Sequence, residues 1–333
     1  MIDKTIRELK ERYPYIKIYL DDFDLCFDEG KSFEENLKEQ PDSFFEQRKM
    51  TIGEIVDEFK DYLEKAVAIL NENMERVDHI TVFPGKGKDG APEAFEKITV
   101  QPGEIIAIVG ETGSGKSRLL EDIEWQAEKD TPTGRTVMIN DMPKKERKKL
   151  SGRQRMIAQL SQNMNFVLDM NVDEFLTMHA ECFVGKAEVP GLVEKVYEAA
   201  IKLSGEKFMP DSSITGLSGG QSRALMIADC AYISRAPIIL IDEIENAGID
   251  IQKAMKILVG SEKIVFIATH DPVLALFANK RIVIKNGAIC NVIERNEEEE
   301  KALHEAEKLD RQLLLLRNRI RAGEIISQFG EMA

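Results

Sequence analysis

Residues 110–117 read GETGSGKS and fit the pattern of a phosphate-binding loop, G-x-x-x-x-G-K-S. The loop follows an apolar stretch, 105–109, that predicts a strand, and it precedes a stretch that predicts a helix. Glycine permits the backbone path that lets amide groups converge on a β-phosphate, and a helix N-terminus adds partial positive charge. We expect Lys116 to reach the β- and γ-phosphates and Ser117 to place its hydroxyl on Mg²⁺. The predicted nucleotide-binding residues of this loop are Gly110, Glu111, Thr112, Gly113, Ser114, Gly115, Lys116 and Ser117.

Polar side chains also end three other apolar stretches. Asp242 and Glu243 close PIILIDE, where Asp242 can hold Mg²⁺ through water and Glu243 can take a proton from an attacking water. His270 ends IVFIATH and is expected beside the γ-phosphate, and Gln162 ends IAQLSQ, where it can coordinate metal or orient water. The predicted catalytic residues are therefore Glu243, His270 and Gln162, and the predicted metal ligands are Ser117, Gln162 and Asp242.

A second glycine-rich stretch, GLSGGQ at 216–221, lies about a hundred residues beyond the first. Ser218 and the amides of Gly219 and Gly220 precede a stretch that predicts a helix, so they form another N-terminus suited to an anion. One nucleotide site does not by itself explain two such loops in one chain.

The ordered set GETGSGKS, Gln162, LSGGQ, IILIDE, NAGID and His270 resembles the nucleotide-binding subunit of ATP-binding-cassette (ABC) proteins over roughly residues 78–290. The resemblance implies an α/β P-loop NTPase fold of ABC type. Such a fold has a mixed, mainly parallel core sheet, an antiparallel β subdomain and an α-helical subdomain, here about 163–217. It also implies ATP hydrolysis, with ATP and Mg²⁺ as the ligands.

The resemblance gives the second loop a role. In that family two subunits meet head-to-tail, and each ATP lies between the phosphate loop of one and the signature loop of the other. This implies a second copy of the chain as partner, with Ser218, Gly219, Gly220 and Gln221 facing the partner's nucleotide. Loss of the γ-phosphate would then weaken the interface.

Two further residues gain roles from the same resemblance. Phe83 lies near the position of an aromatic that stacks on adenine, although it could equally belong to the core. Asp250 in NAGID matches the loop that couples the two sites.

The sequence also departs from the usual pattern: Ile244 replaces a proline after the catalytic Glu, and Asp229 stands where an arginine is common. These departures suggest a branch away from typical importers.

Composition limits the surroundings and partners of the chain. Among 333 residues, 43% are hydrophobic and 31% are charged, and the formal net charge is −14, so a nucleic-acid partner is disfavoured. No apolar run reaches the length of a membrane-spanning helix, and no signal-peptide core opens the chain. We therefore expect a cytoplasmic protein, or one peripheral at the inner face of the membrane through a partner. The four cysteines are far apart, which predicts reduced thiols mostly packed in the interior.

Two helical regions flank the ABC-like part. Residues 1–75 are acidic and contain two capping-box signatures, Thr5 with Glu8 and Thr51 with Glu54. Residues 291–333 form a charged tail, in which 292–328 are expected to be helical with an apolar seam. The seam either folds back onto its own domain or pairs with another chain. Its residues are Ala302, Ala306, Leu309, Leu313, Leu316 and Ile320.

Three interpretations of the ATPase remain. In the first, it is the ATP-hydrolysing subunit of a membrane transporter and drives transmembrane permease subunits. In the second, it is a soluble ABC ATPase that acts on a cytosolic protein in assembly, activation or repair. A third, a scaffold without catalysis, is disfavoured because Glu243 and His270 are both present.

Overall fold

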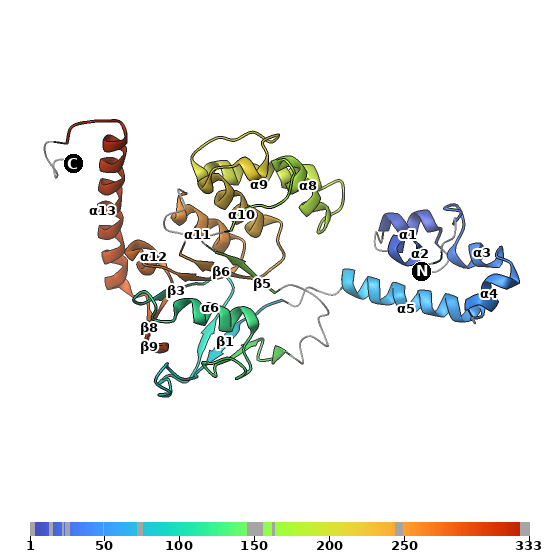
Figure 1. The fold of residues 1–333 in the computed structure, drawn as a ribbon, viewed down its shortest axis with the longest axis horizontal. Coiled ribbons are helices and arrows are strands. Elements are labelled where there is room, and N and C mark those ends of the chain that lie inside the picture. The colour runs from blue at the N-terminus through green and yellow to red at the C-terminus, as the bar shows by residue number, and fades with distance from the viewer. Residues whose placement is uncertain are drawn as a thin grey trace. The chain divides into compact units, whose positions relative to one another are not determined.

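The chain forms two compact units, Met1–Arg76 and Val77–Ala333. Each is described by itself (Figure 1). The computed structural model describes residues 4–12, 16–21, 23, 27–48, 50–71, 76–144, 156–161, 164–243 and 249–326.

The first unit is a small helical bundle with an aromatic core. Phe33 stacks on Phe59 with 3.9 Å between ring centroids, and Tyr19 stacks on Tyr62 at 4.6 Å. Buried aliphatic side chains from the same helices complete this core. The helices are α1 (Ile6–Arg12), α2 (Ile16–Asp21), α3 (Phe33–Lys38), α4 (Asp42–Arg48) and α5 (Ile52–Asn71).

Both predicted capping boxes are confirmed. The amide of Thr51 donates to Glu54 Oε2 at 2.8 Å and the amide of Glu54 donates to Thr51 Oγ1 at 3.3 Å, and Thr5 and Glu8 repeat the arrangement. These bonds satisfy amides that the first helical turn leaves without partners. The bonds from Thr51 also hold the pKa of Glu54 below its usual value.

The second unit contains two sheets. The larger has the order β5-β6-β7-β3-β8-β9, and its strands are parallel except for β9; the smaller, β2-β1-β4, is antiparallel. The strands are β1 (Ile80–Phe83), β2 (Ile98–Val100), β3 (Ile105–Val109), β4 (Thr136–Ile139), β5 (Ile157–Leu160), β6 (Ile238–Asp242), β7 (Ile264–Ala268), β8 (Lys280–Lys285) and β9 (Ala288–Glu294).

Helix α6 packs on one face of the larger sheet, and α10 and α11 pack on the other (Figure 1). The helices of the second unit are α6 (Lys116–Trp125), α8 (Val172–Glu181), α9 (Val189–Ser204), α10 (Gly219–Tyr232), α11 (Ile251–Gly260), α12 (Pro272–Phe277) and α13 (Glu297–Arg321), with a 3-10 turn at Ile214–Gly216.

Strand β3 shows why its sequence is almost continuously apolar. Ile106 and Ile108 pack with α6 and the small antiparallel sheet, whereas Ile105 and Ala107 pack with α10 and α11 on the other face. A strand covered on both faces needs apolar residues at every position.

The predicted fold, an α/β P-loop NTPase of ABC type with a mixed sheet, is confirmed. Strand β4 pairs with β1 in the antiparallel sheet and is not part of the parallel one.

Helices α8, α9 and α10 share a core of their own. Within it, Asp229 of α10 and His179 of α8 form a contact of 2.6 Å between Oδ1 and Nδ1. The unusual acid of the signature helix is therefore a partner of His179 that ties the helical subdomain together.

The tail helix is shorter than its prediction at both ends. Residues 292–294 extend β9, since Glu294 pairs with Lys280 of β8, and the helix runs only from Glu297 to Arg321. Leu303 is buried and α12 contacts α13, whereas Leu309, Leu313 and Ile320 of the seam are exposed. The base of the helix packs on its own domain, but the seam does not.

The prediction that the cysteines are mostly interior is wrong for the described residues. Cys230 is buried, and burial raises its pKa to about 12. Cys182 and Cys290 are exposed. Cys182 caps the C-terminus of α8, and Cys290 alternates with the inward Ile289 on an edge strand. Cys26 lies outside the described residues.

A buried ion network joins the small sheet, α6 and β9. Arg135 is fully buried, and its guanidinium contacts Glu93 Oε1 at 2.6 Å and Asp122 Oδ2 at 2.9 Å. It also donates to the carbonyl of Gly287 at 2.8 Å, and Glu93 accepts from the amide of Ile289 at 2.6 Å. Removing one partner from such a network leaves an uncompensated buried charge.

Arg135→Met should lower the free energy of unfolding of the second unit by about 3–5 kcal/mol, because two carboxylates would lose their buried cation. Urea denaturation followed by the fluorescence of Trp125 measures this directly, since this is the only tryptophan of the chain and it lies on α6.

Lys202→Met is the matched control. Lys202 forms an exposed pair with Glu198 at 3.0 Å, so its loss should cost less than about 1 kcal/mol. Equal effects of the two substitutions would contradict the structural role of the buried network.

Candidate active site

The candidate site lies at the carboxyl ends of the parallel strands. Asp242 of β6 is level with Ala268 of β7, and Ala268 is level with Ile108 of β3. The phosphate loop, the Asp242–Glu243 pair and His270 therefore leave the sheet at the same edge. Leu160 of β5 is level with Ile241, so the segment that leads to Gln162 begins at this edge too. Gln162 itself lies outside the described residues.

The phosphate loop is held by bonds along its backbone. The amide of Gly287 donates to the carbonyl of Ser114 at 2.7 Å, and Lys88 Nζ donates to the carbonyl of Gly113 at 2.7 Å. A Cβ at Gly110 would come within 2.4 Å of the carbonyl oxygen of Ile284, so only glycine fits there. Gly115 caps α6 with φ at +113°, a backbone conformation that favours glycine.

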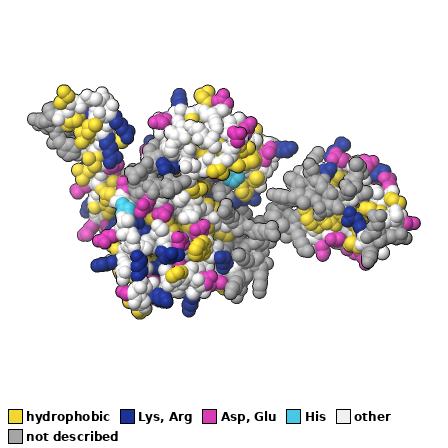
Figure 2. Space-filling view, viewed as in Figure 1, with side chains coloured by type: hydrophobic (Ala, Val, Ile, Leu, Met, Phe, Trp, Pro, Cys, Tyr) yellow, Lys and Arg dark blue, Asp and Glu magenta, His cyan; other side chains and the backbone are white. Residues whose placement is uncertain are grey.

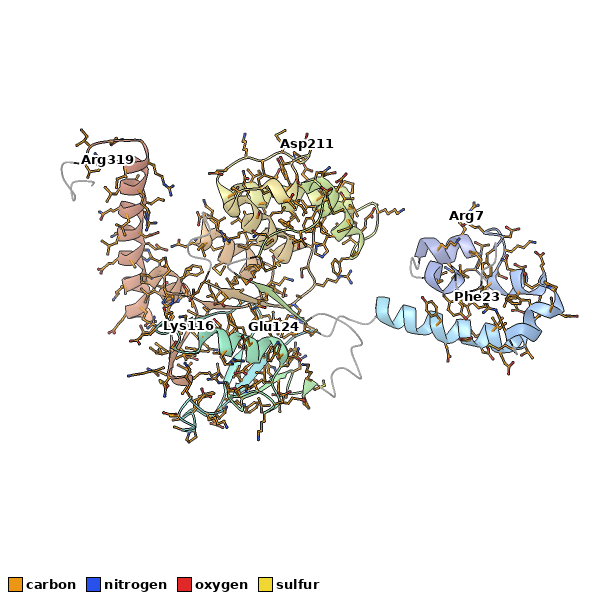
Figure 3. The ribbon with its side chains drawn as sticks, viewed as in Figure 1. Arg7, Phe23, Lys116, Glu124, Asp211 and Arg319 are labelled. Carbon is orange, nitrogen blue, oxygen red and sulfur yellow. The ribbon has the colours of Figure 1, made fainter. Side chains whose placement is uncertain are left out.

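This loop has the features that a bound triphosphate requires. It opens the ten-residue helix α6, whose first residue is Lys116 (Figure 3). Ser114 Oγ is buried without a hydrogen-bond partner in the structure. The space beside the Cα of Gly113 is empty: apart from the two residues adjacent in the chain, no neighbouring atom lies within 4 Å of the position that a Cβ would occupy. A ligand can therefore reach the backbone there. Phosphate oxygens would supply the missing acceptors at this helix N-terminus.

Three predicted residues meet in one cluster. Lys116 is only 5% exposed, and its Nζ donates to the carbonyl of Gly110 at 3.1 Å. The same Nζ lies 2.8 Å from His270 Nε2 and 3.6 Å from Glu243 Oε1, and His270 Nε2 lies 3.2 Å from that carboxylate oxygen. The imidazole nitrogen can accept from the ammonium or donate to the carboxylate, but not both at once.

The backbone at Glu243 is unusual. Its φ is +47°, in the left-handed region that a residue other than glycine rarely adopts, and its amide donates to the carbonyl of Ala268 at 3.0 Å. The chain therefore turns sharply as β6 ends, and the carboxylate is brought to Lys116 and His270. The following residues, 244–248, which include most of NAGID, lie outside the described residues.

The signature loop is an exposed helix N-terminus. Ser218 caps α10: its amide donates to Gln221 Oε1 at 2.9 Å, and its Oγ accepts from the amide of Gln221 at 3.3 Å. Ser218 and Gly219 are exposed. The loop thus presents its first-turn glycine amides at the surface of the helical subdomain.

The two residues that the resemblance added have local roles as well. Asp250 caps α11, accepts from the amide of Lys253 at 3.0 Å, and lies 2.9 Å from Lys253 Nζ. Burial raises the pKa of Asp250, but the bonds from Lys253 outweigh it and hold the pKa below its usual value. Phe83 is half-buried at the end of β1, where it pairs with Thr136.

Sequence reasoning missed Lys88 and Arg135. Lys88 lies between β1 and β2, and nothing in the local sequence shows that its amine reaches Gly113. Arg135 contacts residues 42, 13 and 152 positions away, so no local pattern reveals it.

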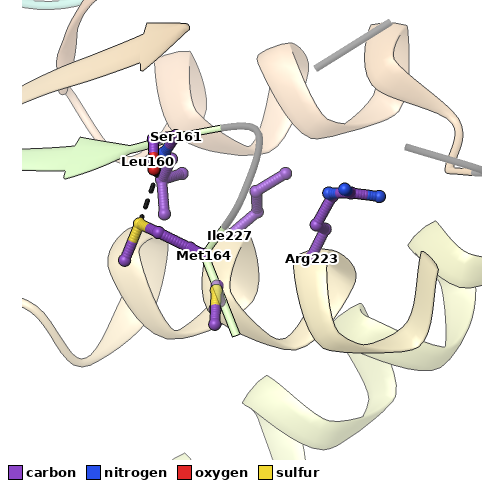
Figure 4. A pocket seen from close by; sticks show the side chains of 6 residues that line it. Leu160, Ser161, Met164, Arg223 and Ile227 are labelled. Carbon is purple, nitrogen blue, oxygen red and sulfur yellow. Dashed lines mark hydrogen bonds between the residues drawn. The ribbon is translucent and has the colours of Figure 1, made fainter. Parts of the chain in front are cut away.

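A small pocket lies beside the segment that leads to Gln162 (Figure 4). The amide of Ser161 donates to Met164 Sδ at 3.3 Å across it, and the guanidinium of Arg223 stands at its other side. Met164 is an exposed apolar residue, and so are Val167 and Leu168, which follow it in the chain. The pocket is lined by Leu160, Ser161, Met164, Arg223, Met226 and Ile227.

Within the described part of the chain, no helix has both the length and the apolar character of a membrane span.

The family model described as "ABC transporter" matches residues 96–246. Among solved structures, cbiO1 from Clostridium perfringens, described as part of the ABC transporter complex cbiONQ, covers 74% of this chain and 98% of its own, with a TM-score of 0.49 and 21% identity.

Curated relatives extend this similarity. The "ABC transporter ATP-binding protein YxdL" of Bacillus subtilis is 28% identical over 68% of this chain and 88% of its own length. The "Uncharacterized ABC transporter ATP-binding protein MJ0121" of Methanocaldococcus jannaschii is 47% identical over 249 residues, which cover 74% of this chain and 94% of that protein. With nearly half of the residues shared over almost the whole of that relative, the chain belongs to the ATP-binding proteins of the ABC transporter family and is an ABC-type ATPase.

Proposed function

We propose that the chain binds Mg-ATP between two copies arranged head-to-tail, hydrolyses it, and so drives permease subunits in a membrane. The observation that carries this proposal is the meeting of Lys116, Glu243 and His270 at one edge of the parallel sheet. It supports the proposal because a cation for phosphate, a carboxylate and an imidazole are the groups that phosphoryl transfer to water needs.

The nucleotide side of the site would be formed by the phosphate loop. Its amides at 113–115 would bind the β-phosphate, and Lys116 would neutralise the β- and γ-phosphates. Thr112 and Glu111 complete the loop, and Phe83 would stack on adenine from the end of β1. When bound, Mg²⁺ would neutralise the phosphate oxygens, and the hydroxyl of Ser117, the carboxylate of Asp242 and the amide of Gln162 are the oxygen donors suited to hold it.

The chemical step would depend on Glu243. Its carboxylate would hold the proton of the attacking water, and His270 would stand beside the γ-phosphate. In this structure Lys116 contacts Glu243 Oε1. A phosphate that bonds with Lys116 would give the lysine a stronger partner and leave the carboxylate for water.

The second copy would complete the site through the signature loop. The capping box uses the amides of Ser218 and Gln221 and leaves those of Gly219 and Gly220 outside it, so these two would suit the γ-phosphate of ATP bound to the other copy. Asp250, at the start of α11 and hydrogen-bonded by its amide to Leu203 of α9, would couple the two sites.

The pocket beside Ser161 would receive the permease. It adjoins the segment that leads to Gln162, so a partner seated there would sense the nucleotide site. Val167 is 90% exposed and, with Met164 and Leu168, offers an apolar surface for a helix. The similarity to YxdL and MJ0121, both described as ABC transporter ATP-binding proteins, favours this partner over a soluble one. The protein would then be peripheral to a membrane.

Lys116→Ala should weaken ATP binding by roughly 10- to 100-fold, because charge-assisted hydrogen bonds to phosphate contribute about 1.5–3 kcal/mol. Isothermal titration calorimetry with Mg-ATP measures the affinity. Lys202→Ala, on the surface of the helical subdomain, is the control that should bind normally. Unchanged affinity of Lys116→Ala would refute its role.

Glu243→Gln should bind ATP but lower kcat by about 10²- to 10⁴-fold, because it removes the group that accepts the proton. The unhydrolysed ATP should remain with the protein through rapid desalting. Adding Ser218→Glu to this variant should abolish retention, because its charge would repel the nucleotide of the other copy. Full retention in the double variant would contradict the shared site.

Val167→Asp should leave basal ATP hydrolysis unchanged and weaken copurification with a multi-span protein from membranes of the source cells. Val167 follows Gln162 by five residues, but its own side chain is 90% exposed and has no assigned part in catalysis, so the substitution tests docking. Copurification with soluble proteins alone, unaffected by this change, would favour the assembly or repair function instead.

A further inference from the structure

Helix α13 carries an exposed apolar stripe along its length. Leu309, Leu313, Leu316 and Ile320 follow spacings of four, three and four, which places them on one side of a helix with 3.6 residues per turn. Leu309 is 62% exposed, Leu313 42% and Ile320 57%. Figure 2 shows hydrophobic side chains along this helix, and Figure 3 places Arg319 near its outer end. Apolar residues at this spacing are the pattern by which one helix pairs with another.

The stripe is not the face that packs against the chain's own domain. Leu303, only 6% exposed, lies on the face toward α12, and Glu299 pairs with Arg281 of β8 on that side. Leu303 follows Ala302, the first position of the stripe, by one residue and therefore by roughly 100° around the helix. Packing at the base thus leaves the stripe open from Ala302 onward.

The spacing of the stripe is symmetric about Arg311. If a second α13 lies antiparallel with the two-fold axis at Arg311, Ala302 faces Ile320, Ala306 faces Leu316, and Leu309 faces Leu313. A small residue then meets a large one at each end, so the helices keep an even separation. A parallel pair would place alanines together at one end and large residues together at the other.

Charge favours the same orientation. Residues 297–310 hold seven carboxylates and two lysines, whereas 311–321 hold four arginines and no carboxylate. Antiparallel helices bring the acidic half of each copy against the basic half of the other, and Glu305 comes beside Arg319. The two copies of Asp310 approach near the axis, each beside Arg311. Parallel helices would set like charges together along their whole length.

The geometry points to a second copy of this chain as the occupant: two α13 helices pair antiparallel about a two-fold axis at Arg311. The contact is isologous, so the same stripe serves both copies and the assembly closes as a dimer. The pairing needs no nucleotide, and it is separate from the ATP-dependent contact proposed above.

Light scattering of the full-length protein without nucleotide tests this pairing. The wild type should have twice the mass of 37.6 kDa at tens of micromolar, and Leu313→Glu should shift it to the single mass. Leu315→Glu is the matched control, because Leu315 is 49% exposed but lies on another side of the helix. A monomeric wild type, or equal loss of the dimer in both variants, would overturn the proposal.

The orientation has its own test. Arg319→Glu should weaken the dimer, although this arginine also bonds with Glu324 of its own chain at 2.6 Å. Adding Glu305→Arg should restore the dimer only if the helices are antiparallel, since the two residues lie nearly four turns apart within one helix. If the double variant does not regain the dimer, this register is wrong.

Leu313→Glu should still retain ATP in the Glu243→Gln background, which separates this proposal from the shared nucleotide site.

Discussion

The hydrogen-bonded register of β3, β7 and β6 is the constraint on which the site depends. It sets Ile108, Ala268 and Asp242 level with one another, so the loops that follow these strands leave the sheet together. Lys116, His270 and Glu243 are far apart in sequence, yet their reactive atoms lie 2.8–3.6 Å apart. If β6 shifted by one residue, each of its side chains would move to the other face of the sheet. Asp242 and Glu243 would then be misplaced, and the cluster would not form.

The site also holds backbone conformations that the rest of the fold must stabilise. A left-handed φ at Glu243 costs on the order of 1–3 kcal/mol, and it persists because β6 is buried on both faces and the amide of Glu243 is bonded to Ala268. The phosphate loop is supported similarly. Arg135 donates to the carbonyl of Gly287, and the amide of Gly287 donates to the carbonyl of Ser114, so the buried ion network reaches the loop through a single residue.

The sequence predicts the parallel strands and the phosphate loop because both depend on local patterns: apolar runs bounded by turns, and glycines before Lys116. The family resemblance supplies the fold and the ATPase activity, which the comparisons confirm. Local patterns fail where distant residues decide the outcome. The pairing of β9 with β8 extends a strand into the expected tail helix, the alternation of an edge strand exposes Cys290, and Lys88 and Arg135 act through partners far along the chain. The roles assigned to the site residues, those of Gln162, Asp250 and Phe83 among them, stay predictions.

The two proposed contacts between copies have different physical consequences. The contact through ATP depends on a γ-phosphate that hydrolysis removes, so it must form and break in each cycle. The contact through α13 rests on apolar burial and fixed charges, so it persists through the cycle. A persistent tail contact would raise the effective concentration of one copy near the other, often to the millimolar range for short connections. Both contacts are two-fold symmetric, and if they share one axis, ATP needs only to close a pair that is already assembled. The nucleotide would then control the distance between the ATPase domains of the two copies. A permease bound beside Ser161 on each copy would move with that distance.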